Sequence, residues 1–169
     1  MAWNADGTRL PARMHIEYIR NLFLNYDLAE GRFQVTGRPI ELDDIKLPIF
    51  SVGTEHDHIA PWHSVYKVHL QNDDEITFVL TSGGHNAGIV SEPGHAQRHF
   101  RLRVRDSGGQ TMGPDEWALD TPPQDGSWWP KWNEWSVAHG AATRIPPPSL
   151  GTGDFPPLCD APGTYILEG

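Results

Sequence analysis

Two short apolar runs dominate the hydrophobic pattern of the chain, at residues 47–52 and 75–80. Their length and their content of β-branched and aromatic residues predict two buried strands. Each run ends in a loop of small residues, and the first loop carries Asp57 whereas the second carries His85. Because α/β enzymes place reactive side chains in loops after buried strands, the pattern predicts an α/β fold with both side chains at the carboxyl edge of its sheet.

The segment before these strands has a helical period. Apolar residues at positions 14, 18, 22, 23 and 26 predict an amphipathic helix over about residues 12–27, and we expect Gly31 to end it. The next apolar residues alternate with polar ones around Thr36 and Gly37, which predicts a small hairpin.

Further elements are expected between and after the two strands. A helix is predicted over about residues 61–70, a half-buried or edge strand over 100–105, and a helix start at 113–117. Tryptophans spaced at i, i+4 and i+7 predict a helix over about 127–139. From residue 145 the chain is rich in proline and has no period, so we expect an extended tail.

Bulk composition narrows the classes of protein. The chain has 169 residues, enough for one domain with a core, and a net charge of −9 that argues against a nucleic-acid surface. The sequence shows no apolar window long enough for a membrane span and no pattern of a signal peptide. A single cysteine, Cys159, cannot form an internal disulfide and fits a reducing compartment, so a cytoplasmic protein is predicted.

Asp57 and His85 form the most informative pair of side chains. A carboxylate that accepts a hydrogen bond from one imidazole nitrogen holds the ring in a single tautomer, and the other nitrogen can then take a proton from a nucleophile. A simpler interpretation is a loop acid that caps the helix beginning near Pro61, together with a loop histidine that has structural hydrogen bonds. Residue spacing alone leaves both interpretations open.

A zinc site is a competing interpretation, because His56, Asp57, His58 and His63 lie within eight residues. Side chains of neighbouring residues point in different directions, and no second cluster offers matching ligands. The sequence therefore predicts no metal.

A nucleophile is harder to find. Neither a Gly-x-Ser-x-Gly motif nor its cysteine counterpart precedes Asp57, Ser51 lies inside a predicted strand, and Ser82 lies only three residues before His85. Cys159 follows the histidine, in the proline-rich tail. We expect that this sequence cannot build a complete triad by itself.

Residues 95–105 hold four arginines and two histidines. They could meet an anionic substrate such as a phosphate-bearing thioester, with Arg98, Arg101 and His58 as candidate binding residues. The alternative is the solvated, charged face of an edge strand. The tryptophans near residue 130 likewise predict either a docking surface or the packed face of a helix.

Several motifs resemble the C-terminal portion of the polyhydroxyalkanoate synthases, which are α/β-hydrolase-type acyltransferases. They are WNAD at residues 3–6 with Leu10-Pro11, EHDHIAPW at 55–62, SGGHNAG at 82–88, GSWWP at 126–130 with Trp132 and Trp135, and APGTY at 161–165. They occur in the family's order and span nearly the whole chain.

The resemblance implies an enzyme that polymerises (R)-3-hydroxyacyl-CoA into a polyester and releases CoA, with the CoA thioester as substrate and no cofactor. It implies a Cys-His-Asp triad in which His85 is the general base, while Asp57 orients His85 or helps to activate the incoming hydroxyl. The triad cysteine would lie in polypeptide absent from this chain. Partners implied are the polyester chain, a second copy or an N-terminal synthase half, and the cytoplasmic granule surface.

The same resemblance divides the chain into residues 1–30, a remnant of the cap, residues 31–140, the part of the catalytic domain with Asp57 and His85, and a tail over 141–169. The family commonly has an aliphatic residue after the triad histidine and Asn-Pro-Pro shortly beyond, where this chain has Asn86 and Ser-Glu-Pro at 91–93. That difference affects substrate preference more than the triad assignment.

Two other functions stay open: an esterase or depolymerase of the same fold, with water as acceptor, and a non-catalytic remnant that binds a synthase partner or the granule. We expect the isolated chain to be inactive as a polymerase, because no covalent intermediate forms without a nucleophile. We also expect low stability or self-association, because severed core strands leave an unpaired sheet edge.

Overall fold

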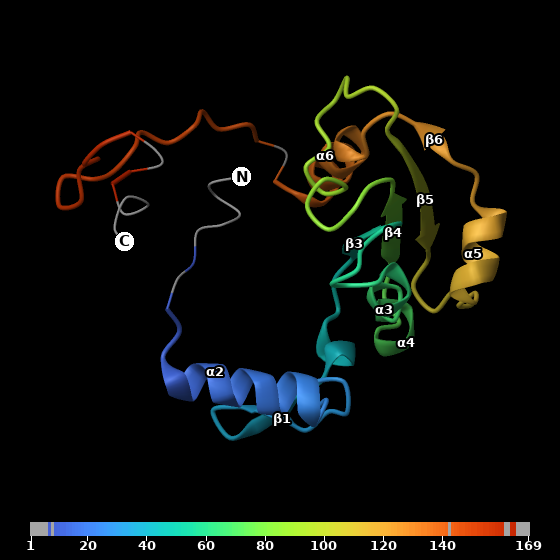
Figure 1. Ribbon diagram of the computed structural model, residues 1–169, viewed down its shortest axis with the longest axis horizontal. Coiled ribbons are helices and arrows are strands. Elements are labelled where there is room, and N and C mark those ends of the chain that lie inside the picture. Colours follow the sequence, from blue (N-terminus) through green and yellow to red (C-terminus); the bar gives the residue numbers. More distant parts are fainter. Residues whose placement is uncertain (1–6, 8, 142, 161–162, 165–169) are drawn as a thin grey trace.

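A four-stranded mixed sheet forms the centre of the molecule (Figure 1). The computed structural model describes residues 7, 9–141, 143–160 and 163–164. The strands lie in the order β3 (Ile49–Thr54), β4 (Ile76–Thr81), β5 (His99–Arg105) and β6 (Gln124–Asp125). The predicted α/β class is confirmed.

The pairing of the strands explains which loops lie together. β3 and β4 are parallel, in a register that runs from Ile49 opposite Ile76 to Thr54 opposite Thr81. β5 runs antiparallel to β4, and β6 pairs with the first two residues of β5. Because β3 and β4 end at the same edge, the loops that follow them lie side by side.

β4 is buried along its whole length, as a continuous apolar run predicts for a strand covered on both faces. On one face Phe78 packs edge-on against Tyr66 and Trp117, with ring centroids 5.0 and 5.1 Å apart. On the other face Val79 packs with Phe100 and Trp128. The sheet therefore separates two small aromatic cores.

Short helices supply these aromatic side chains. The predicted helix at 61–70 is two helices, α3 (Trp62–Val65) and α4 (Val68–Gln71), which cover the first face together with α5 (Pro114–Asp120). α5 begins as predicted, with Gly113 at its N-cap and a proline in its first turn. α6 (Trp129–His139) covers the second face.

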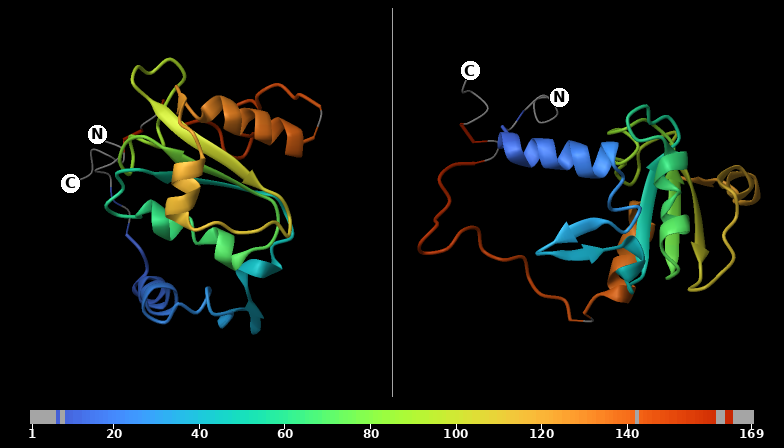
Figure 2. Two further views of the ribbon diagram at one scale, coloured as in Figure 1. Left: turned by 90° about the vertical axis from the view of Figure 1, so that its right-hand side faces the viewer. Right: turned by 90° about the horizontal axis from the view of Figure 1, so that it is seen from below.

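The N-terminal region lies to one side of the sheet (Figure 2). α2 (Ala12–Tyr18) continues as a π-helix over Ile19–Leu24, so the predicted helix ends before Gly31. β1 (Phe33–Val35) and β2 (Arg38–Ile40) form the predicted hairpin. Its turn residues, Thr36 and Gly37, have φ angles of 50° and 78°, as a tight two-residue turn with the twist of the strands requires.

The apolar side chains of this region are exposed. The large ones that reach solvent include Leu10, Met14, Ile16, Tyr18, Ile19, Phe23, Leu24, Tyr26 and Val35. Leu24 has 70% of its surface exposed. A helix forms over residues 12–24, shorter than the predicted 12–27, and its predicted apolar face is exposed except at Leu22, which is half-buried.

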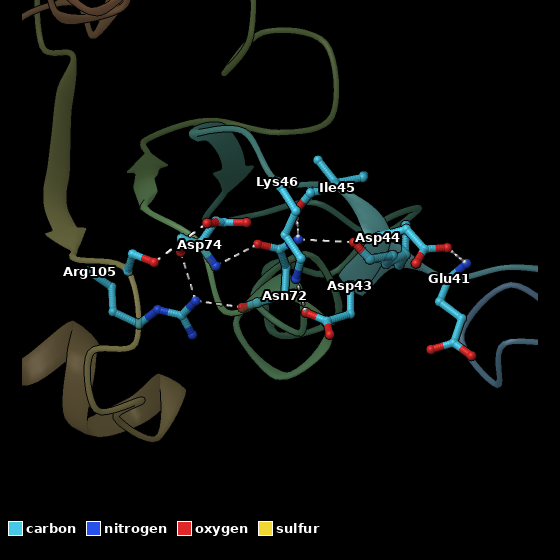
Figure 3. A network of polar contacts seen from close by, with 10 residues as sticks. Glu41, Asp43, Asp44, Ile45, Lys46, Asn72, Asp74 and Arg105 are labelled. Atoms are coloured by element: carbon cyan, nitrogen blue, oxygen red, sulfur yellow. Dashed lines mark hydrogen bonds and ion pairs between the residues drawn. The ribbon is translucent and has the colours of Figure 1, made fainter.

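A network of hydrogen bonds to backbone carbonyls joins the N-terminal region to the sheet (Figure 3). Asn72, just after α4, donates from Nδ2 to the carbonyls of Leu42 and Ile45, both at 2.9 Å. Leu42 belongs to the 3-10 turn η2 (Leu42–Asp44). Arg105 at the end of β5 donates to the carbonyls of His69 and Asp74 and is buried. The interpretation of a fully solvated arginine face is therefore wrong at Arg105.

The chain after α6 forms no helix or strand over residues 143–160, where every residue is exposed. The motif at residues 3–6 lies outside the described residues, as do Ala161, Pro162 and Tyr165. In the described part of the chain, none of the helices has the length and apolar content that crossing a membrane requires.

Candidate active site

The loops after β3 and β4 are joined by backbone hydrogen bonds that extend the parallel ladder beyond the strands. The amide of Glu55 donates to the carbonyl of Thr81 at 2.9 Å, and the amide of His56 donates to the carbonyl of Gly83 at 3.0 Å. These bonds fix the position of the Asp57 loop relative to the His85 loop.

Asp57 and His85 are in direct contact. Nδ1 of His85 lies 2.8 Å from Oδ2 and 3.0 Å from Oδ1 of Asp57. The side chain of Asp57 is only 7% exposed, whereas that of His85 is 45% exposed. The acid is therefore enclosed by the loop while the imidazole reaches the surface, which suits a pair that meets a substrate from outside.

The same carboxylate also orders its own loop. Oδ1 of Asp57 accepts the amides of Ile59 and Ala60, both at 2.8 Å, and Oδ2 lies 3.4 Å from the hydroxyl of Thr54. The two interpretations of Asp57, a local cap and a histidine partner, are thus both realised, although the capped amides lie in the turn before Pro61 and not in a helix.

These contacts determine the protonation state of Asp57 and, through it, the tautomer of the neutral His85 ring. Desolvation raises the pKa of the Asp57 carboxyl, but hydrogen bonds from Ala60, His85 and Ile59 outweigh it and lower the pKa to about 2. Asp57 is therefore ionised at neutral pH and can only accept hydrogen bonds. The proton of the neutral imidazole must then be on Nδ1, so Nε2 carries the lone pair that can accept a proton.

Glycines shape the loop that carries His85. Gly83 has a φ of 107°, and a Cβ there would lie 2.7 Å from Nη1 of Arg98. A Cβ on Gly88 would lie 2.6 Å from the methyl carbon of Thr54. The spacing of glycines in SGGHNAG therefore permits a close approach between this loop, Arg98 and the end of β3.

The three candidate binding residues lie in different places. His58 is exposed in the Asp57 loop. Arg98 lies beside the His85 loop, with Nη1 3.5 Å from the carbonyl of Ser82. Arg101 instead donates to the carbonyl of Thr121, just after α5. Only Arg98 and His58 are therefore close in structure to the loops of the pair.

The suggested metal ligands separate in the structure. Asp57 pairs with His85, and Nε2 of His63 lies 2.9 Å from Oδ1 of Asp115 on α5. Among the described residues, no group of three or more acidic, histidine or cysteine side chains is arranged to hold a metal ion.

None of the candidate nucleophiles is placed like a triad residue. Ser51 lies within β3, and Ser82 is buried with its hydroxyl accepting the amide of His99 at 3.1 Å. Cys159 is an exposed thiol in the segment after α6.

Two groups of contacts around the site could not be read from the sequence. Nε2 of His99 lies 3.2 Å from the carboxylate of Glu55, a residue 44 positions earlier. Trp128 and Trp129 donate from their indoles to the carbonyls of Gly88 and Ile89. The GSWWP motif was identified in the sequence, but nothing in its residue spacing indicated that it contacts the loop of His85.

Comparisons with known proteins extend this picture. The chain is 39% identical over 166 residues to a poly(3-hydroxyalkanoate) polymerase of Methylorubrum extorquens, which covers 97% of the chain and 26% of that protein. It is 37% identical over 165 residues to poly(3-hydroxyalkanoate) polymerase 2 of Ectopseudomonas oleovorans, covering 98% of the chain and 29% of the relative. It is 31% identical over 166 residues to the poly(3-hydroxyalkanoate) polymerase subunit PhaC of Cupriavidus necator, covering 97% of the chain and 27% of the relative.

No family model matches the chain. The chain spans about a quarter of the length of these curated relatives. The resemblance to a portion of the polyhydroxyalkanoate synthases, which the motifs indicated, is confirmed.

Proposed function

We propose that this chain supplies the acid and the base of a Cys-His-Asp triad in a polyhydroxyalkanoate synthase-type acyltransferase. Such an enzyme extends a polyester from (R)-3-hydroxyacyl-CoA and releases CoA. The observation that carries the proposal is the contact of 2.8 Å between Asp57 and Nδ1 of His85, on adjacent loops. The similarity to poly(3-hydroxyalkanoate) polymerases supports the choice of reaction.

The topology supports an α/β-hydrolase-type fold for the complete enzyme. In that fold the acid precedes the histidine in the chain, and both follow core strands. Here Asp57 follows β3 and His85 follows its parallel neighbour β4. The nucleophile would come from polypeptide outside this sequence.

The chemistry follows from the tautomer. Nε2 of His85 takes the proton of the cysteine thiol, and the thiolate attacks the thioester carbonyl of the acyl-CoA. The bond to CoA sulfur breaks, the proton returns from Nε2 to the CoA thiolate, and the acyl group stays on the cysteine. For chain extension, Nε2 takes the proton of a 3-hydroxyl group as that oxygen attacks the carbonyl of the enzyme-bound thioester. The new ester bond forms, the bond between the acyl carbon and the cysteine sulfur breaks, and the proton on Nε2 returns to the released cysteine thiolate.

Asp57 acts as the orienting residue in this scheme. Its carboxylate is enclosed and is already engaged with His85, Ile59 and Ala60. That arrangement favours stabilisation of the His85 imidazolium over direct activation of the incoming hydroxyl. The proposed setting is the cytoplasm, at the polyester granule surface, with the rest of the synthase as partner.

A chimera tests the proposal. The matching segment of the Methylorubrum extorquens polymerase is replaced by this chain, and CoA release from (R)-3-hydroxybutyryl-CoA is followed with a thiol reagent. His85→Ala should lower the turnover of the chimera on the order of 10²–10⁴-fold, because a general base contributes that much. His95→Ala is the matched control, because the exposed His95 side chain hydrogen-bonds to the neighbouring carbonyl of Ala96 and His95 lies outside the pair.

The isolated chain should release no CoA under the same conditions. Release that persists in a variant with both His85→Ala and Cys159→Ala would remove the triad assignment. A chimera that retains full turnover with His85→Ala would do the same. Hydrolysis of the acyl-CoA without polymer would instead favour an esterase, with water as acceptor.

A further inference from the structure

The turn that carries His85 is closed by its own backbone. The amide of Gly88 donates to the carbonyl of Gly84 at 2.9 Å, so His85 lies inside a closed loop of five residues. The amide of Val90 makes an equivalent bond to the carbonyl of Asn86, also at 2.9 Å. The position of His85 therefore depends on where Gly88 and the residues after it are held.

Three consecutive residues at the start of α6 hold that segment. The hydroxyl of Ser127 donates to the carbonyl of Ser91. The indole of Trp128 donates to the carbonyl of Gly88 at 3.1 Å, and the indole of Trp129 donates to the carbonyl of Ile89 at 2.9 Å. The carbonyls of Gly88, Ile89 and Ser91 thus each accept a hydrogen bond from a side chain of the GSWWP motif, and that of Ile89 also accepts the amide of Ser91 at 3.0 Å.

The donors are themselves fixed by the core. Trp128 is buried in the cluster that contains Val79 and Phe100, and its ring stacks on Phe50 with centroids 6.2 Å apart. Because Phe50 lies in β3 and Val79 in β4, the indole is anchored to both strands that lead to the site. A tryptophan loses few rotamers on ordering and offers one directed N–H, which suits it to hold a carbonyl.

The opposite side of Gly88 is held by the Asp57 loop. The Cα of Gly88 faces Thr54 so closely that a Cβ would lie 2.6 Å from the Thr54 methyl carbon. The hydroxyl of Thr54 lies 3.4 Å from Oδ2 of Asp57. Gly88 is therefore enclosed between α6 and the strand end that presents the acid.

We propose that Trp128 and Trp129 are positioning residues that hold the His85 turn against Asp57 through their indole N–H groups. The expected effect on turnover rests on the function proposed above, whereas the expected effect on the orientation of the His85 ring does not. Without the two indole donors, the bond from Ser127 still holds the segment at Ser91, but Gly88 and Ile89 lose their attachment to α6 and the imidazole no longer has a single orientation toward the carboxylate.

The test is the tautomer of His85, measured by ¹⁵N NMR of the imidazole at a pH where the ¹⁵N shifts show the ring to be neutral. In the unmodified chain His85 should be entirely the Nδ1–H form, because ionised Asp57 accepts from Nδ1. Trp129→Phe and Trp128→Phe remove one donor each, and the double variant should show a mixture of tautomers. Trp132→Phe is the matched control, because Trp132 is on the same helix, is 49% exposed and packs edge-on against Trp128 with ring centroids 6.4 Å apart. It alters the packing around Trp128 and removes neither indole donor to the turn, so it should leave the tautomer unchanged.

Replacement of Trp129 by 3-benzothienylalanine keeps the ring shape and removes only the N–H, so it separates the donor from the packing. A mixture of tautomers in this variant supports the proposal. A pure Nδ1–H form in both this variant and the folded double variant overturns it. If Trp128→Phe does not fold, the benzothienyl variant at Trp129 alone decides.

In the chimera, the double variant should lower kcat about 10- to 100-fold with little change in KM, the scale expected for a misplaced catalytic group. The two proposals can fail separately. If the tryptophan variants show a mixture of tautomers but His85→Ala leaves turnover of the chimera unchanged, the proposed function is overturned and the positioning role stands. If the tautomer is unchanged in the tryptophan variants but His85→Ala abolishes turnover, the positioning role is overturned and the proposed function stands.

Discussion

The sheet region and the N-terminal region both have an amphipathic sequence pattern, but they differ in how far their apolar side chains are buried. In the sheet region, Trp128 beside α6 is 7% exposed because the apolar positions face β3 and β4. In the N-terminal region, Phe23, on the predicted apolar face of the helix that begins as α2, is 56% exposed. Periodicity therefore predicts that a helix forms and which residues share a face, but it does not supply the surface that covers that face.

The largest difference between the regions should appear in their phenylalanines. Phe78→Ala removes a ring packed between Tyr66 and Trp117, so it should lower the free energy of unfolding by about 3–5 kcal/mol. Phe23→Ala removes a ring that is mostly exposed and should cost less than about 0.5 kcal/mol. Urea unfolding of both variants measures the contrast, and equal losses would mean that the π-helix that follows α2 is covered in solution.

A smaller effect is expected at the joint between the regions. Asn72→Ala leaves the carbonyls of Leu42 and Ile45 without their side-chain donor, which should cost about 1–3 kcal/mol. It should also speed amide exchange in residues 42–45. Asn133→Ala on the exposed side of α6 is the control and should change stability by less than about 0.5 kcal/mol. Unchanged exchange in Asn72→Ala would show that the N-terminal region is attached by other contacts.

The smallest expected effect is on the stability of the chain at acidic pH. The pKa of Asp57 is about 2 in the folded chain and about 3.9 when unfolded, so its contribution to stability is complete above about pH 4 and is lost as pH falls toward 2. Asp57→Asn removes this contribution, and the difference in unfolding free energy between the two chains should shrink as pH falls from 4 to 2. Asp43→Asn, at an exposed site, controls for the loss of a carboxyl group as such. Equal slopes for Asp57→Asn and the unmodified chain in that range would contradict the assigned pKa.

The sequence predicted the elements that depend on local signals. The runs in β3 and β4, the turn at Thr36 and Gly37, and the proline start of α5 each have such a signal, and each was found. The approach of Asp57 to His85 was also predictable, since parallel neighbours end at one edge of a sheet.

What depends on tertiary contacts was not predictable. Alternation in β5 showed which residues share a face, but not that α4 and the segment after it would cover Arg105. The contacts of Trp128 and Trp129 with residues 40 positions earlier have no local pattern. The same holds for the pairing of Glu55 with His99.

One carboxylate oxygen, Oδ1 of Asp57, receives two main-chain amides and lies within 3.0 Å of the imidazole. Any change of charge on the ring must therefore alter the electric field felt by the N–H groups of Ile59 and Ala60. Their chemical shifts form a built-in gauge of the protonation of His85, readable without substrate and without a label on the histidine itself.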